Sequence, residues 1–494
     1  MSELRSMTKQ SSHYFMAYAL SMVASFISFP IYTRLFSVSD YGILNVISST
    51  VFFVMAAAKL GIQNSIIRFY EEVKSNAADI SLRSFYSTLT FGPLAVVGIA
   101  CLLYGVSIIA MRGHLGGSAV TLYFLLSAVW VFFLCSNTIL KNFLRAEQNT
   151  ALFTGLSIVS KFLSLVVGVG LVYYVFKSLL GLFVSFIITE SLTFAFLMWR
   201  LYVKERIFIG GFSLAFFKKA LSYGLPLVVS EMTSIILNSG GRYVILFYMS
   251  AAAVGMYSAG YDLAMSVMES LIFPLSFAIT PIYMKIYSQK GKQETGVFLS
   301  HCLRYFLLIA LPCIFGLNLL GREITIFIAS HKYEQAYAII PYVSWGVLIF
   351  GLSSIFNAGL FIEKKNGVIT FWTVIAGTVN IALNFILIPR MGLVGSAIAT
   401  LIVYVSLFAV LAFRSFEFLP FRIDFANIGR YLMSSVIMTV MISFIRFDKP
   451  LVSLAVKFGA GIVAYAALVL MFDADIRSRL SVKFSGKELA HEAV

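Results

Sequence analysis

PIYTRLFSVSDYGILNVISS, residues 30–49, is a short polar interruption between two long apolar runs. Its two charged residues, Arg34 and Asp40, lie in the gap between these runs. A helix needs roughly 20 residues to cross a hydrocarbon core of about 30 Å, and both runs reach that length. We therefore expect the turn of a helical hairpin at a membrane surface, with Ser39 or Asp40 as the N-cap of the second helix and Gly42 allowing close packing at its start.

The same pattern continues along the whole chain. Its 494 residues are 60% hydrophobic and 12% charged, with a mean hydropathy of +0.91, far from the composition of soluble domains. The long apolar runs lack the ten-residue alternation of outer-membrane barrel strands, so the spans are helices. About fourteen runs are long enough to cross a bilayer, near 14–33, 43–65, 85–110, 118–140, 151–175, 178–199, 220–247, 254–282, 298–320, 335–360, 367–388, 391–413, 427–445 and 450–471.

Charge, cysteine and histidine narrow the class of protein further. The net charge is +15, and most Lys and Arg fall on one side if the N-terminus is cytoplasmic, which is the positive-inside pattern with both termini in the cytoplasm. The basic excess therefore indicates topology and contact with anionic lipids rather than nucleic acid. The four cysteines lie in apolar runs and the five histidines are scattered, so we expect no metal site and no cofactor. The first run leads directly into a second span, which favours a membrane span over a signal peptide.

The longest connection, residues 201–219, is basic and contains two adjacent glycines, which is typical of an amphipathic surface segment. It divides the spans into two sets of six and a final pair. The predicted organisation is a bundle over 1–205, a cytoplasmic linker over 206–219, a second bundle over 220–414, and a helix pair with a cytoplasmic tail over 415–494.

Three short comparisons, taken in chain order, indicate that the two sets are repeats. They match LFSVSDYGIL with YMSAAAVGMY, LRAEQNTALF with FIEKKNGVIT, and GLFVSFIIT with GLVGSAIAT, pairing Gly42 with Gly255, Asn149 with Asn366, and Gly181 with Gly392 at nearly one separation. Since six is even, both sets begin on the same side of the membrane. Parallel repeats of this kind enclose a cavity suited to alternating access.

Three stretches carry a resemblance to a known family: residues 30–49, KLGIQNSIIRFYEE (59–72) and LIPRMGLVGSAIATLIVY (387–404). They resemble the polysaccharide-export branch of the MOP superfamily, whose best-known members are the Wzx-type flippases of the bacterial inner membrane. The resemblance implies an all-α, MATE-like integral membrane protein with about fourteen transmembrane helices, arranged as two parallel six-helix repeats plus a C-terminal pair. MATE drug exporters and lipid II flippases share this architecture, although MATE proteins generally lack the final pair.

Cations inside apolar spans are candidates for substrate binding, because a buried charge is costly unless it faces a cavity or a partner. Lys161 lies near mid-depth, where the side chain cannot easily reach the interface. Lys59 and Arg304 fit either a cavity or a stem that extends to the surface, and Arg68 fits an interfacial position. The candidates are Lys59, Lys161, Arg242, Arg304 and Arg68.

The candidate ion-coupling acids are Glu231, Asp262 and Glu269. Asp262 and Glu269 are two helical turns apart and share a face, and Asp262 lies at the depth of Arg242, so an ion pair between them is one alternative to a proton or sodium site. A protonated, neutral carboxyl is another. Glu190 is a weaker candidate of the same kind. The resemblance implies that spans 1, 2, 7 and 8 line the cavity, which places Lys161 and Glu190 behind it.

The resemblance implies a flippase for an undecaprenyl-pyrophosphate-linked oligosaccharide, such as an O-antigen, capsule or exopolysaccharide unit, moved from the cytoplasmic to the periplasmic leaflet by alternating access. Its partners would be this substrate, membrane lipids, and the polymerase and chain-length regulator of the same pathway; the coupling ion would be H⁺ or Na⁺. A MATE-like exporter of cations is the first alternative, and it needs an acidic cavity. A membrane glycosyltransferase or polymerase needs acid and base residues in sizeable external loops, which this chain lacks, so we do not expect an enzyme.

Overall fold

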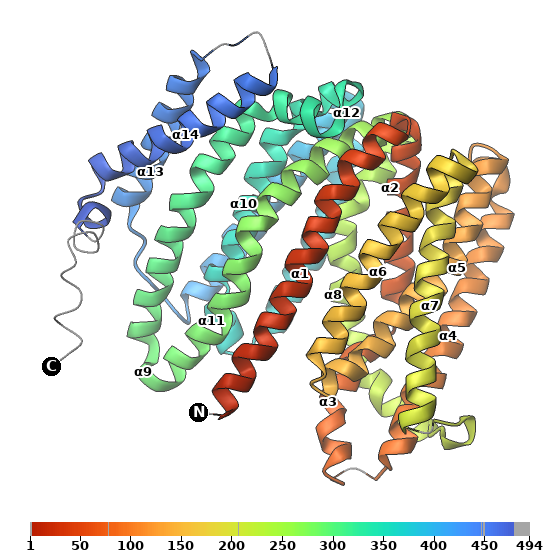
Figure 1. Ribbon diagram of the computed structural model, residues 1–494. Helices are drawn as coiled ribbons and strands as arrows, with labels where there is room; N and C mark the ends of the chain where they lie inside the picture. The colour runs from red at the N-terminus through yellow and green to blue at the C-terminus, as the bar shows by residue number, and fades with distance from the viewer. Residues whose placement is uncertain (1, 78, 206, 446, 448–449, 479–494) are drawn as a thin grey trace. The chain divides into compact units, whose positions relative to one another are not determined.

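The computed structural model describes residues 2–77, 79–205, 207–445, 447 and 450–478 (Figure 1). Within that part of the chain the regular elements are all helical, which confirms the predicted fold class. The helices are α1 (Ser2–Leu35), α2 (Val38–Ala58), α3 (Ile62–Lys74), α4 (Leu82–Ala110), α5 (Ser118–Ala146), α6 (Thr150–Leu171), α7 (Leu179–Glu205), α8 (Leu214–Tyr248), α9 (Ala251–Ala329), α10 (Ile340–Phe356), α11 (Ala358–Ile362), α12 (Asn366–Phe416), α13 (Phe425–Ser443) and α14 (Pro450–Phe472). Short helical turns connect them: η1 (Arg112–His114), η2 (Val172–Phe176), η3 (Ile209–Gly211) and η4 (His331–Ile339).

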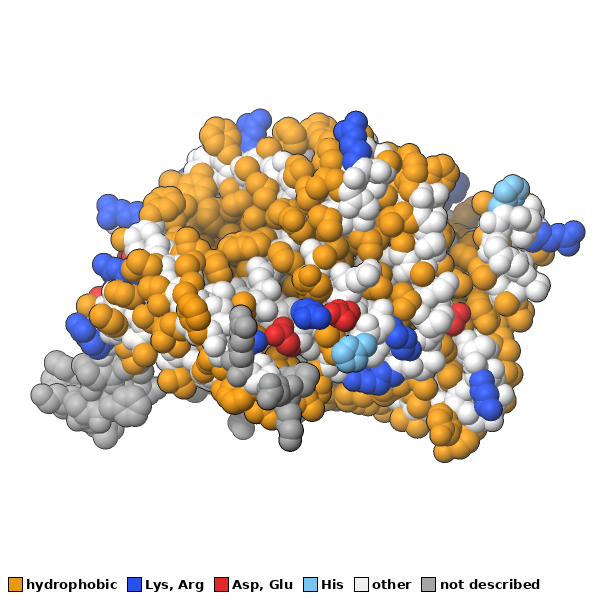
Figure 2. All heavy atoms as spheres, turned by 90° about the horizontal axis from the view of Figure 1, so that it is seen from above, with side chains coloured by type: hydrophobic (Ala, Val, Ile, Leu, Met, Phe, Trp, Pro, Cys, Tyr) orange, Lys and Arg blue, Asp and Glu red, His pale blue; other side chains and the backbone are white. Residues whose placement is uncertain are grey.

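Eleven stretches of the described residues are long and apolar enough to cross a membrane. Two of them each hold two predicted spans, because α9 is interrupted at Gly291 (φ 80°) and α12 at Gly392 (φ 60°). With these halves counted separately and α1 covering the first predicted span, the structure agrees with the prediction of about fourteen spans. Hydrophobic side chains cover much of the face drawn in Figure 2, and Lys and Arg side chains lie both along its outline and within it. The chain is a multi-pass membrane protein.

The chain forms two compact units, Met1–Gly255 and Met256–Val494. In the first unit, α4, α5, α6 and α7 pack against one another, α1 packs on α6, and α8 packs on both α2 and α3. The predicted repeat boundary at 206–219 stays a prediction, as does the cytoplasmic tail, whose end beyond residue 478 lies outside the described residues.

In the second unit, the C-terminal pair is fastened to the second half of α9. Helix α14 contacts it through Lys457 Nζ and Glu323 Oε1 (3.1 Å) and through the Tyr465 hydroxyl and the Leu308 carbonyl oxygen (2.7 Å). Asp473, directly after α14, adds a third contact with Arg304 (2.7 Å). Because residue numbers rise along α14 as they fall along α9, the two helices are antiparallel. The final pair is therefore an integral part of this unit.

Two glycines that the sequence comparison matched to each other are in contact in the first unit. A Cβ atom on Gly42 would lie 1.8 Å from the Ala251 carbonyl oxygen, and one on Gly255 would lie 1.9 Å from the Val38 carbonyl oxygen. Real side chains never approach backbone so closely, so the start of α2 and the start of α9 meet only because both positions lack a side chain.

A buried carboxylate joins the ends of α4, α5 and α7. Glu147 accepts a hydrogen bond from the Tyr86 hydroxyl (2.8 Å) and pairs with Arg200 and Lys204. Burial alone would raise the pKa of Glu147, but the hydrogen bonds from Arg200 and Tyr86 outweigh it and hold that pKa below its ordinary value of 4.5.

Replacing Gly42 with Ala should force α2 away from Ala251 and lower the free energy of unfolding by about 1–3 kcal/mol or more, the usual cost of overpacking. Gly105→Ala is the matched control, because nothing lies within 4 Å of a Cβ atom at that position in α4. Alanine favours a helix over glycine by up to about 1 kcal/mol, so the control should be neutral or slightly stabilised. Thermal unfolding of the purified protein measures both, and equal stabilities would contradict the close contact.

The lowered pKa of Glu147 predicts a pH dependence of stability. Its contribution is fully present above the ordinary pKa of 4.5 and is lost as the pH falls through the lowered pKa of the folded state. Wild-type protein should therefore lose more stability between about pH 6 and about pH 3 than Glu147→Gln does. Glu71→Gln, at an exposed position 3.7 Å from Lys74, should behave like wild type. If the melting temperatures of wild type and Glu147→Gln fell by the same amount over this pH range, Glu147 would make no such contribution to stability.

Candidate functional site

The second predicted span is broken in the middle of its polar segment. Helix α2 ends at Ala58 and α3 begins at Ile62, with Leu60 and Gly61 both at positive φ (51° and 70°). Left-handed backbone is costly for leucine, so the surroundings must hold it in place. A Cβ atom on Gly61 would lie 2.1 Å from the Gly224 carbonyl oxygen of α8. The break therefore lies directly against the backbone of α8.

A lysine and a glutamate meet at this break. Lys59 is 4% exposed, and its Nζ lies 2.5 Å from Glu231 Oε1. Gln63 at the start of α3 donates from Nε2 to Glu231 Oε2 (3.2 Å). Lys59 also caps the C-terminus of α2, where the helix dipole favours a cation. The two charges are thus held from both sides of the break.

The sequence of α8 explains why Glu231 reaches this point. Ala220, Gly224 and Glu231 recur at helical spacing and share one face. The Ala220 carbonyl oxygen accepts a hydrogen bond from Ser65 Oγ of α3 (2.7 Å), and Gly224 allows the close approach described above. The face of α8 that carries Glu231 is therefore the face that packs on α3.

This arrangement allows the Glu231 carboxylate to be displaced while the Lys59 ammonium stays in place. The side chain of Lys59 is 5% exposed and that of Glu231 is 32% exposed. An anion entering from the accessible side can take over the ammonium, and the carboxylate can then bind a proton or another cation. Sequence reasoning named both residues but missed the break, Gln63 and Gly61. The run LGIQN in an otherwise apolar span was the available signal, because glycine and amides interrupt helices at such depth only where they line a cavity or bury against protein.

A second group of charges lies among α5, α6 and α7. Glu190 accepts from Asn137 Nδ2 at its carboxylate (2.6 Å) and at its backbone carbonyl (2.8 Å). Lys161 of α6 and Lys141 of α5 both interact electrostatically with Glu190. The predicted candidate Lys161 therefore belongs to a cluster that also contains Asn137 and Lys141, which sequence reasoning did not select.

Arg242 is 8% exposed in α8 and donates from Nη1 to Ser239 Oγ (3.2 Å). Next to it, the Tyr243 hydroxyl lies 2.9 Å from Thr50 Oγ1 of α2. The predicted pair between Arg242 and Asp262 would join residues of the two units and stays a prediction.

Asp262 and Glu269 are partly buried on α9 and interact electrostatically, as expected for acids two turns apart. Glu269 also interacts with Tyr404 of α12, which is hydrogen-bonded to Tyr261. Two carboxyls on one helix face, one of them interacting with a tyrosine, resemble a site that binds a proton or a small cation. Their role in coupling stays a prediction.

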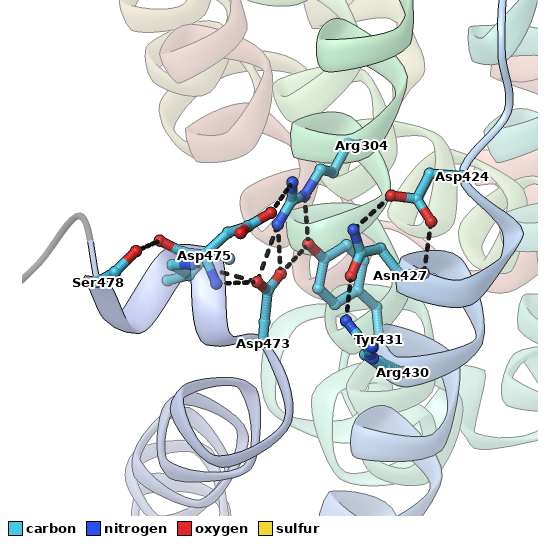
Figure 3. A network of polar contacts seen from close by, with 9 residues as sticks. Arg304, Asp424, Asn427, Arg430, Tyr431, Asp473, Asp475 and Ser478 are labelled. Atoms are coloured by element: carbon cyan, nitrogen blue, oxygen red, sulfur yellow. Dashed lines mark hydrogen bonds and ion pairs between the residues drawn. The ribbon is translucent and has the colours of Figure 1, made fainter.

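Arg304 is enclosed by the C-terminal pair (Figure 3). Its guanidinium donates to the Tyr431 hydroxyl (2.9 Å), to both carboxylate oxygens of Asp473 (2.9 and 2.7 Å) and to Asp475 (3.0 Å). These bonds engage all three guanidinium nitrogens. Burial acts to raise the pKa of Asp473, but hydrogen bonds from the Tyr431 hydroxyl (2.6 Å) and from Arg304 hold that pKa below its usual value. The geometry favours a structural role for Arg304, as it does for Arg68, which is exposed and lies 3.8 Å from Glu72.

The chain is similar to several known proteins. The model of the family described as polysaccharide biosynthesis protein matches residues 31–338. A probable low-salt glycan biosynthesis flippase, Agl15, of Haloferax volcanii is 22% identical over 251 residues, which make up 48% of this chain and 52% of that protein. The chain thus spans about half the length of this relative.

Two solved structures share the fold. The lipid II flippase MurJ, in an inward closed conformation, superposes with a TM-score of 0.76 at 16% identity, over 95% of this chain and 99% of that one. A multidrug resistance MATE transporter, in an inward-facing conformation, gives a TM-score of 0.63 at 13% identity, over 81% of this chain and 94% of that one. These superpositions show a common fold, and the one with the lipid II flippase covers nearly the whole chain.

Removing one partner of the central ion pair should destabilise the protein more than removing both. Lys59→Met leaves Glu231 beside an apolar side chain, and breaking a buried pair costs roughly 3–5 kcal/mol. We expect about 3 kcal/mol, because solvation of the partly exposed carboxylate offsets part of that cost. The double variant Lys59→Met with Glu231→Met should recover most of this loss. Thermal unfolding compares them, and a double variant no more stable than the single one would count against the pair.

Proposed function

The chain belongs to the polysaccharide biosynthesis protein family, and from this premise we propose that it moves a lipid-linked oligosaccharide across the membrane. The observation that carries the proposal is the Lys59–Glu231 pair at the break between α2 and α3. A buried ammonium with a displaceable counter-ion suits a substrate whose head group is anionic. Moving such a substrate requires binding and release and no covalent chemistry.

The proposed substrate is an undecaprenyl-pyrophosphate-linked oligosaccharide, the repeat unit of an O-antigen, capsule or exopolysaccharide. Its pyrophosphate needs compensating cations in any space of low dielectric constant. The polyprenyl tail can remain in the bilayer, because drawing its apolar surface through a polar cavity would be costly. The proposed setting is the bacterial inner membrane, with both termini cytoplasmic and transfer toward the periplasmic leaflet.

The proposed mechanism is alternating access coupled to a proton or sodium gradient. When pyrophosphate takes over Lys59, the carboxylate of Glu231 is freed and can bind the coupling ion. Asp262 and Glu269 provide a second acidic position for that ion in the other unit. A polymerase and a chain-length regulator of the same pathway are the proposed partners, since they would use the translocated repeat unit.

A MATE-like exporter of small cations is the second candidate, because the fold is shared with a MATE transporter. The buried position of Lys59 favours the flippase, since a site for organic cations needs a net negative charge. Transport of a cationic dye without transport of a glycan lipid would favour the exporter.

Flipping can be measured in proteoliposomes that contain an undecaprenyl-pyrophosphate-linked oligosaccharide. A membrane-impermeant glycosidase added outside reports how fast the glycan reaches the outer leaflet. We expect Lys59→Gln to slow this step at least tenfold, because pyrophosphate loses its counter-ion. Lys218→Gln, at an exposed position in α8, is the matched change of charge and should leave the rate within twofold.

The coupling is tested in the same vesicles by collapsing the proton and sodium gradients. A rate that falls on collapse supports ion coupling. An unchanged rate replaces coupling with facilitated equilibration. A wild-type protein that moves no glycan lipid in either condition refutes the proposed function.

A further inference from the structure

Lys161 lies on a buried face of α6, and its side chain is nevertheless accessible to solvent. Thr154, Leu165 and Gly168 are spaced at helical intervals around Lys161 and are all buried, whereas Lys161 is exposed. This row faces α7, because a Cβ atom on Gly168 would lie 3.1 Å from both Leu182 and Ser185. The helices that pack on this row therefore leave the Lys161 side chain accessible.

The opposite face of α6 identifies the side that packs against lipid. Val159, Leu163 and Val166 follow one another at helical spacing and are 59%, 37% and 68% exposed. Lys161 is half a turn away from them around the helix axis. Its ammonium therefore points into the first unit, toward α5 and α7.

The cluster lies deep in the membrane. Counted from the Glu147–Arg200 ion pair at the ends of α5 and α7, Asn137 and Glu190 lie about 15 Å further along their helices at 1.5 Å per residue. The hydrocarbon core of a bilayer is about 30 Å thick, so this distance is close to half of it. The ammonium of Lys161, at the same level, is too far from the surface to reach it by extending its stem.

The charges of this cluster do not neutralise one another. Two lysines, Lys141 and Lys161, share one carboxylate, Glu190. That carboxylate is hydrogen-bonded to Asn137, and among the described residues neither lysine makes an ion pair within 4.0 Å. The site keeps an excess positive charge and donors that are free to bind an anion.

One acceptor in the cluster is also unsatisfied. Asn137 is 1% exposed, and its Oδ1 has no hydrogen-bond partner among the described residues, whereas its Nδ2 donates to Glu190 twice. A buried acceptor without a donor is costly. A ligand that fits must therefore carry both a negative charge for the lysines and a hydroxyl donor for Asn137.

We propose that Lys141, Lys161, Glu190 and Asn137 form a binding site for an acidic sugar of the transported glycan, a uronic acid. Its carboxylate binds the two ammonium groups, and a ring hydroxyl donates to Asn137 Oδ1. Glu190 holds Asn137 in place and limits the excess charge, so that a neutral sugar is not excluded. The inference rests on the proposed function, and it assigns the sugar selectivity to a place separate from the Lys59–Glu231 pair.

The site is tested by binding of methyl β-D-glucuronide and methyl β-D-glucoside to the full-length protein in detergent, measured by titration calorimetry. Wild type should bind the glucuronide at least tenfold more tightly than the glucoside. Lys161→Gln and Lys141→Gln should each abolish that preference while leaving glucoside binding within twofold, and Lys161→Arg should restore most of it. Glu190→Gln should strengthen glucuronide binding severalfold, because it removes the only negative charge of the cluster while keeping an amide or carbonyl for Asn137.

Lys218→Gln is the control for a loss of one surface charge and should keep the wild-type preference. The melting temperature of each variant is first compared with that of wild type, so that a loss of binding caused by unfolding is excluded. No preference in wild type, or a preference unchanged in both lysine variants, overturns the site. Sodium sulfate, which has charge but no hydroxyl, should bind at least tenfold more weakly than the glucuronide; equal binding would overturn the assignment to a sugar acid.

Flipping assays separate this inference from the function on which it rests. A protein that prefers glucuronide but moves no glycan lipid refutes the proposed function and leaves the binding site standing. A protein that flips neutral and acidic glycan lipids equally, and shows no preference between the two glycosides, keeps its function and loses the site.

Discussion

A backbone that crosses hydrocarbon must satisfy its own hydrogen bonds, and the break between α2 and α3 is where this chain meets that demand in an irregular way. The Lys59 amide still bonds to the Met55 carbonyl oxygen (3.1 Å), and the Ile62 amide bonds to the Lys59 carbonyl oxygen (3.0 Å). Turn bonds thus replace helical ones across Leu60 and Gly61. The cost of the left-handed backbone is offset by packing on α8, so the site exists because the two helices touch there.

The intramembrane charges differ in how completely the protein neutralises them. Arg304 is surrounded by two aspartates and a tyrosine, which engage all three of its guanidinium nitrogens and make it an anchor for the C-terminal pair. Lys59 has one partner that is itself partly exposed. Lys161 has an electrostatic partner without a direct ion pair. An isolated charge at this depth is costly. A cation that the protein neutralises less completely is therefore better suited to bind an anionic ligand.

Close approach between helices depends on glycine at both ends of α2. Gly42 lies against the start of α9, and Gly61 lies against Gly224. Neither contact leaves room for a methyl group. The sequence pattern predicts that Gly42 and Gly255 are equivalent positions of a repeat. The structure places these two positions against each other, and sequence similarity alone cannot indicate such a contact.

The length of the apolar runs and their lack of alternation by themselves determined that the chain is an all-helical membrane protein with about fourteen spans, because crossing a bilayer imposes the same demand on every segment. Residue type and position also selected Lys59, Glu231 and Lys161, since a charge in an apolar run is conspicuous. Only the tertiary structure decided which charges meet: it paired Lys59 with Glu231, enclosed Arg304, and grouped Lys161 with Lys141, Glu190 and Asn137. These pairings depend on how the helices rotate and pack about one another. No local sequence pattern indicates which residues distant in the chain will meet.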